Sequence, residues 1–170
     1  MLNCKISAGV SANCETSIGG ILKLAFANFD PDIDITASTG CEADTISGID
    51  KVYEVDFLDG TGLAEVELNV GDSRDKKNFT HRITLNFAKL DCNMLEQYKN
   101  WSLAHLIAFV QTKDGNVYAF GKNTGLAATT FNYTSGSNET DSSLVNAVFE
   151  GVQLDAPIKI KDWAVVSALF

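Results

Sequence analysis

The sequence contains few prolines, few histidines and no long apolar run. Its 170 residues include 2 Pro and 2 His, which excludes a proline-rich or collagen-like chain. No stretch approaches the roughly 20 apolar residues that a membrane-crossing helix needs. The chain also lacks C-x-x-C pairs, a phosphate-binding glycine loop and a G-x-S-x-G nucleophile motif. We therefore expect a protein that is not an enzyme, holds no cofactor or metal, and has no membrane partner.

Positive charge is scarce as well. Lys and Arg total 13 against 22 Asp and Glu, a net charge of -9. Because phosphate binding needs clustered cations, this balance argues against nucleic-acid binding through a basic face. Apolar residues at 45% and charged residues at 21% are typical of a globular chain. The first residues do not resemble a secretory signal, so we expect Cys4, Cys14, Cys41 and Cys92 to be reduced, buried thiols, with a Cys4–Cys14 bridge left open.

Two features that suggest chemistry have simpler interpretations. His81 lies in an alternating run and His105 in the most apolar run, so we expect both to be packed side chains. Residues 30–34 (DPDID) resemble the start of a calcium loop, but Ile35 stands where that loop needs Gly and Cys41 where it needs Glu. We expect a solvated turn there.

The main hydrophobic period is two, which is typical of β-strands. Residues 52–58 and 63–70 both alternate apolar with polar side chains, and a Gly-rich segment at 59–62 separates them. This pattern predicts a β-hairpin with one buried face. Residues 79–87 alternate in the same way, and the charged segment 71–78 between these runs predicts an exposed loop.

One segment changes to helical spacing. Met94, Tyr98 and Trp101 recur three or four residues apart, and Asp91 is a suitable N-cap. The pattern predicts one short α-helix over residues 92–102, with a stripe that packs on the core.

Further strands are expected on both sides of this helix. Residues 103–112 are apolar on both faces, as in a central strand, and an Asp-Gly turn at 113–116 favours a hairpin. The other expected strands cover residues 21–29, 117–120, 126–133, 144–150 and 158–161, with a polar loop at 134–143. The fold class is mainly β: a β-sandwich or open barrel of antiparallel strands with one short inserted α-helix.

The most unusual feature is a set of four carboxylates on the predicted hairpin. By the period-two rule they share its non-core face: Glu54, Asp56, Glu65 and Glu67. Like charges opposite each other across strands are destabilising. The set is either a solvated face that keeps the protein soluble, or a surface that repels polyanions or meets a basic partner or cations.

The C-terminal residues 163–170 (WAVVSALF) are strongly apolar. Exposed patches of this kind mark contacts, so the segment is either the last strand of the core or a docking element for a neighbouring subunit. We expect a single domain over 1–170, with 1–18 and 163–170 as candidate inter-subunit arms.

The order of these elements resembles the major tail tube proteins of long-tailed bacteriophages and the tubes of contractile injection systems. The likeness spans nearly the whole chain. It is carried by Cys4-Lys5-Ile6, Gly19-Gly20-Ile21, Ala27-Asn28-Phe29-Asp30, residues 114–121 (DGNVYAFG), Gly125-Leu126, Ser135-Gly136, Asp141 and Phe149-Glu150-Gly151.

The resemblance implies a virion structural protein that is assembled in the host cytoplasm and resides in the viral tail. Copies of the chain would form six-fold rings that stack into a tube and contact other tail and connector proteins. DNA would pass along the lumen without specific binding, and an acidic lining would oppose adsorption of phosphate.

This resemblance gives roles to two sets of residues. The expected lumen-facing set is Glu54, Asp56, Glu65 and Glu67. The expected inter-subunit contacts are Gly71, Asp72, Arg74, Asp75, Lys76, Lys77, Trp163, Val165, Val166, Leu169 and Phe170.

Two other functions remain open at this point. A tail terminator, connector or tail-ring protein would share the fold but form rings that do not stack indefinitely. A β-sandwich carbohydrate-binding or adhesion module would display tryptophan or tyrosine on a polar strand face. An enzyme is the weakest reading, given the two histidines and the missing metal spacing.

Overall fold

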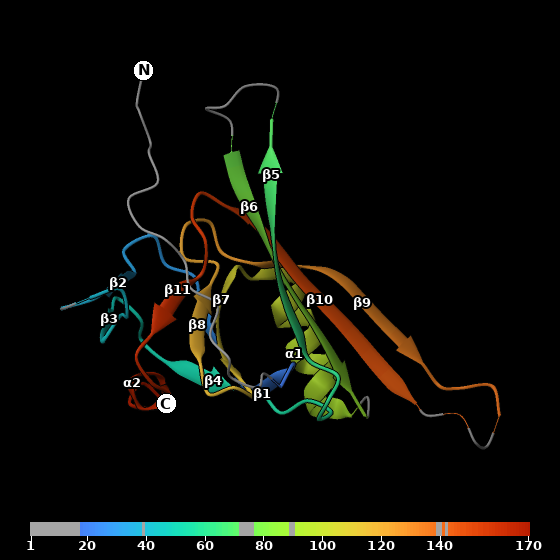
Figure 1. Cartoon of the computed structure of the whole chain (residues 1–170). Helices are drawn as coiled ribbons and strands as arrows, with labels where there is room; N and C mark the ends of the chain where they lie inside the picture. Colours follow the sequence, from blue (N-terminus) through green and yellow to red (C-terminus); the bar gives the residue numbers. More distant parts are fainter. Residues whose placement is uncertain (1–17, 39, 72–76, 89–90, 139–140, 142) are drawn as a thin grey trace.

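The computed structural model describes residues 18–38, 40–71, 77–88, 91–138, 141 and 143–170. The fold is mainly β and antiparallel, as predicted. A five-stranded sheet has the order β11 (Ile158–Ile160), β8 (Val117–Phe120), β7 (Leu106–Thr112), β1 (Ile21–Asn28) and β4 (Val52–Glu54). A four-stranded sheet has the order β5 (Leu63–Val70), β6 (Lys77–Phe87), β10 (Leu144–Gln153) and β9 (Ala127–Thr134). β5 and β6 extend beyond the other strands at one end (Figure 1).

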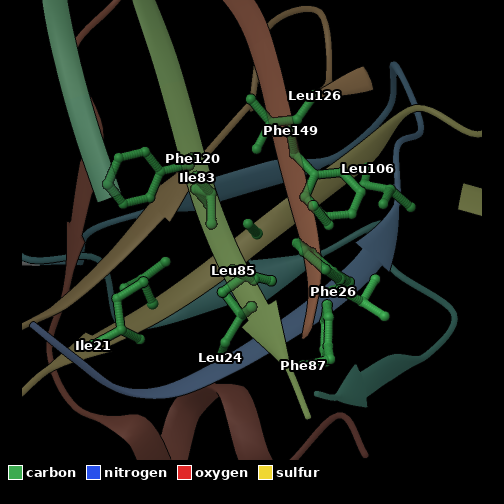
Figure 2. Close-up of a cluster of buried hydrophobic side chains, with 14 residues drawn as sticks. Ile21, Leu24, Phe26, Ile83, Leu85, Phe87, Leu106, Phe120, Leu126 and Phe149 are labelled. Atoms are coloured by element: carbon green, nitrogen blue, oxygen red, sulfur yellow. The ribbon is translucent and has the colours of Figure 1, made fainter. Parts of the chain in front are cut away.

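The two sheets enclose a shared hydrophobic core. Figure 2 shows side chains from β1 of one sheet and from β6 and β10 of the other pointing toward one another, among them Leu24, Leu85 and Phe149. Phe149 is completely buried. Burial of apolar side chains from both sheets is the main force that holds the sandwich closed.

A second core covers the opposite face of the five-stranded sheet. Ile107 and Phe109 of β7 pack there with Val166 of the short helix α2 (Trp163–Ser167) and with Ile35 of β2 (Asp34–Thr36). Among the described residues, β2 pairs with β3 (Thr45–Ser47) alone. The five-stranded sheet is therefore covered on both faces, which explains why β7 shows no alternation in the sequence.

The predicted helix is confirmed as α1 (Cys92–Leu103). The Asp91 carboxylate caps it by accepting a hydrogen bond from the Met94 backbone N–H at 2.8 Å. Trp101 packs edge-on against Phe26 and Phe149, with ring centroids 5.9 and 5.7 Å apart. α1 thus closes the core between the two sheets and contacts both.

The predicted hairpin between residues 52–58 and 63–70 is wrong. β4 pairs with β1, whereas β5 pairs with β6 in the other sheet. The connection between β4 and β5 crosses the sandwich: the Val55 N–H bonds to Leu24 O in one sheet and the Leu58 N–H to Asn86 O in the other. A Cβ at Gly62 would lie 2.7 Å from the Phe57 ring, so this glycine allows the close approach within the crossing.

The C-terminal segment forms neither a strand nor a free arm. Asp162 caps α2 by accepting a hydrogen bond from the Val165 N–H at 3.2 Å, and Val166 is completely buried. The Val52 N–H bonds to Leu169 O, so the segment is fixed to β4 of its own chain. The segment therefore packs on the second core of its own chain.

Several smaller expectations can also be compared with the structure. His81 is buried as predicted, but His105 lies before β7 and is exposed. Cys41 and Cys92 are exposed free thiols, so the prediction that they are buried is wrong. Cys4, Cys14 and the candidate arm at 1–18 lie outside the described residues, apart from Ile18. The hairpin at 113–116 is confirmed by the pairing of β7 with β8 and by a φ of 87° at Gly115.

Candidate functional site: the outer face and edges of the four-stranded sheet

The outer face of the four-stranded sheet is polar. In β6 the odd-numbered residues from His81 to Phe87 are buried and the even-numbered ones are half-buried, which shows that alternate side chains face away from the core. The pairing register places the following side chains on this outer face: Leu63, Glu65, Glu67, Asn69, Asn78, Thr80, Arg82, Thr84, Asn86, Leu144, Asn146, Val148, Glu150, Val152, Thr130 and Asn132. Three carboxylates and one guanidinium leave two net negative charges on it.

Arg82 is at the centre of this charge cluster. Its Nε donates to a Glu150 carboxylate oxygen at 2.7 Å, and both side chains are partly exposed. Glu65 lies directly opposite Arg82 on β5. The hydrogen bond and charge of Glu150 raise the pKa of Arg82, and the charges of Glu65 and Glu67 add to this effect. The alternation in residues 63–70 and 79–87 places Glu65, Glu67 and Arg82 on polar strand faces, but it does not identify Glu150 as the ion-pair partner.

Uncharged side chains connect neighbouring strands on the same face. The Asn146 amide donates to Asn86 Oδ1 at 2.8 Å, and the Asn69 amide donates to Thr80 Oγ1 at 2.7 Å. Such cross-strand pairs stabilise a sheet and fix its register. The outer face is therefore an ordered polar surface.

The four predicted carboxylates do not lie together. Glu65 and Glu67 are on the outer face of the four-stranded sheet. Glu54 and Asp56 belong to β4 and to the crossing that follows it, where they line a cleft of about 870 Å³ between β4 and α1. Asp91, Asn93, Gln97 and Asn100 of the α1 region line the same cleft.

The two edges of this sheet are long and contain neither Lys nor Pro. β5 and β9 have eight residues each, and within the described part of the chain neither pairs on its outer side. The edges of the five-stranded sheet, β4 and β11, have only three residues each. Soluble proteins protect sheet edges by shortening them or by placing Lys or Pro there. β5 and β9 are long and lack Lys and Pro, although β5 carries Glu65 and Glu67 and the pairing of β9 with β10 has a register shift at Val148/Phe149.

The other expected contact residues are distributed as follows. Gly71 and Lys77 flank the tip of the β5–β6 extension and are exposed, whereas Asp72, Arg74, Asp75 and Lys76 lie outside the described residues.

At the C-terminus, Val166 is buried within the chain, and Trp163, Val165 and Leu169 are partly buried against the second core. Phe170 is 47% exposed, so it is the member of this group with the most surface left for a partner.

Comparison with family models, with curated proteins and with solved structures gives no match for this chain. No helix among the described residues is long and apolar enough to cross a membrane.

Proposed function

We propose that the chain is a structural subunit of a viral tail tube, in which copies join edge to edge through the four-stranded sheet into rings that stack. The observation that carries this proposal is the pair of long edge strands without Lys or Pro, β5 and β9, which flank a polar sheet face. Pairing with a neighbouring copy would satisfy the backbone groups of both edges.

The strand directions suit closure into a ring. All pairs in the order β5-β6-β10-β9 are antiparallel, so β5 and β9 run in opposite directions. When copies are related by rotation, β5 of one copy and β9 of the next are therefore antiparallel to each other. A heterologous contact of this kind closes into a ring if the rotation allows.

The stagger of the sheet also suits a barrel. The positions of the two edge strands can be compared along β6. β5 pairs with residues 77–84 of β6. Through their partners on β10, Ala127 and Tyr133 of β9 are level with Arg82 and Phe87 of β6. The centres of the two edge strands are thus offset by about four residues, or about 14 Å along the strands. One copy spans about 19 Å across its four strands, so closure would tilt the strands by roughly 36°, within the usual range for barrels.

The same numbers set the width of the tube. The repeat along the circumference would be about 24 Å per copy, and six copies, the number that the resemblance implies, would give a barrel about 45 Å wide between backbones. This width would admit a DNA double helix.

The charge on the outer face supports its assignment to the lumen. Glu65, Glu67 and Glu150 outnumber Arg82, and β9 carries no charged residue. Edge pairing would therefore bring no like charges into opposition, while the assembled lining would repel the phosphates of a passing DNA strand.

Negative-stain microscopy and sedimentation of the purified chain test this proposal. A tube-forming subunit should give rings at low concentration and long stacked tubes at high concentration. Isolated rings that never stack would favour a tail terminator or connector. A protein that stays monomeric at every concentration would overturn both.

Cross-linking tests the edge pairing itself. In a chain whose four cysteines are replaced by Ser, Glu67→Cys combined with Thr130→Cys should give, on oxidation, a ladder of covalent oligomers that ends at the closed ring. Thr80→Cys with Thr130→Cys is the matched control, because Thr80 lies on the interior strand β6. Equal ladders in both variants would contradict pairing of β5 with β9.

A further inference from the structure

An apolar strip on β5 faces the core side of the sheet but is not buried. Val66 is 41%, Leu68 is 50% and Val70 is 63% exposed, although all three share the face of the buried Ile83. The strip belongs to the C-terminal half of β5, the strand that extends with β6 beyond the five-stranded sheet (Figure 1). A contiguous exposed strip of this kind is typical of a contact surface.

A second exposed apolar group lies at the opposite edge of the same sheet, beside β9. Tyr98 of α1 stacks on Phe131 of β9 with ring centroids 4.0 Å apart, yet remains 38% exposed. Leu95, three residues earlier on the same side of α1, is 50% exposed, and Tyr133 at the end of β9 is also 50% exposed. Phe131 and Tyr133 lie on the core side of β9, because they pair with the buried Ala147 and Val145.

We infer that α1 and β9 of one copy cover the apolar strip on β5 of the next copy. This inference rests on the proposed ring. Centre-to-centre antiparallel pairing of β5 with the neighbouring β9 places Val66 beside Phe131, and Ala64 beside Tyr133, on the same face. Tyr98 of the neighbour, which contacts Phe131, then lies beside Val66. Leu95, one turn nearer the start of α1, lies toward Tyr133 and therefore beside Ala64. In this register the exposed apolar side chains of β5 and those at the β9 edge lie on the same side of the sheet, so each group covers the other from solvent.

The contact assigns α1 two roles with separate residues. Met94 and Trp101 pack against the core of the same chain. Leu95 and Tyr98 point toward the β9 edge, where the next copy would begin. The helix would thus stabilise its own fold through one stripe and the ring through the adjacent one.

Substitution of exposed leucines by Ser tests this contact. Leu68→Ser and Leu95→Ser should each raise the protein concentration at which half of the chains are assembled by about tenfold, measured by sedimentation velocity. Both side chains are half exposed in the single chain, so the melting temperature of the unassembled chain should be unchanged. Leu63→Ser, 49% exposed on the other face of β5, and Leu103→Ser, 80% exposed on α1, are the matched controls and should shift assembly less than twofold.

A charge exchange tests whether the two positions meet. Val66→Lys and Tyr98→Glu should each impair assembly, and the double variant should recover it at least in part, because Tyr98 contacts Phe131, which the register places beside Val66. Assembly of Leu68→Ser and Leu95→Ser at the wild-type concentration, with rings still formed, would overturn this inference alone. Failure of the wild-type chain to form any ring would overturn the proposed function with it.

Discussion

The two sheets of this protein differ in how many of their faces are covered and in the length of their edge strands. The five-stranded sheet is covered on both faces and ends in three-residue edge strands, one of which, β11, contains Lys159. The four-stranded sheet is covered on one face, exposes a polar outer face and ends in eight-residue edges. A sheet completed within one chain needs short edges, whereas a sheet with long open edges is suited to pairing with further copies. The comparison therefore separates the part that stabilises the subunit from the part that we propose assembles it.

The largest expected effect concerns the core that both sheets share. Phe149→Ala should lower the free energy of unfolding by about 3–5 kcal/mol, because the ring is completely buried and the substitution leaves a cavity. Val148→Ala, on the outer face of the same strand, is the matched control and should cost less than about 1 kcal/mol. Urea denaturation measures both, and equal losses would contradict the assignment of an inner and an outer face.

A second prediction concerns the outer cover of the five-stranded sheet. Val166→Ala should lower the free energy of unfolding by about 2 kcal/mol, because Val166 is completely buried against the second core. Ser167→Ala, the exposed neighbour in α2, should change it by less than about 0.5 kcal/mol. A Val166→Ala chain as stable as the wild type would mean that α2 does not protect this sheet.

A third prediction concerns the polar link between the sheets. His81 of β6 contacts Asp155 O through Nε2 at 3.0 Å and accepts from the Gly121 N–H, just after β8, through Nδ1. Burial lowers the pKa of His81. The unfolded chain therefore binds a proton more readily, and the free energy of unfolding should fall as the pH drops below about 6.5.

Denaturation at pH 7, 6 and 5 measures this effect. In His81→Gln, which retains a donor for Asp155 O but does not titrate, the decline over that range should be smaller. An identical decline in both proteins would mean that other groups cause it.

The smallest expected effect concerns the ion pair on the outer face. Glu150→Gln removes the charge that faces Arg82, but both side chains are partly exposed, so the free energy of unfolding should change by less than about 1 kcal/mol. A loss of several kcal/mol, measured by urea denaturation, would mean that this face is buried rather than open.

The sequence predicted faces better than partners. Alternation in residues 63–70 and 79–87 placed Glu65, Glu67 and Arg82 on polar faces correctly, because the period of side chains along a strand is local. The same alternation does not determine the pairing partner of β5, which is β6 rather than β4. A Gly-rich segment such as 59–62 can form the turn of a hairpin or connect strands of two different sheets. The charged segment at 71–78 lies between the two runs that do pair, 63–70 and 79–87.

Short or overlapping patterns explain the other differences. β2 and β3 have three residues each, too few for a period of two to be recognised. The C-terminal segment did carry a helical pattern: Trp163, Val166 and Leu169 are three residues apart, and Asp162 precedes them as an N-cap. Its high apolar content is equally typical of contacts between subunits.

The long register between β6 and β10 has a mechanical consequence. Nine consecutive residue pairs join these two central strands, from Val145 with Phe87 to Gln153 with Phe79. A force that pulls the two strands apart along their length must shear all of these rungs together, whereas a force at one end would peel them one at a time. The sheet should therefore resist tension along its strands far better than tension across them.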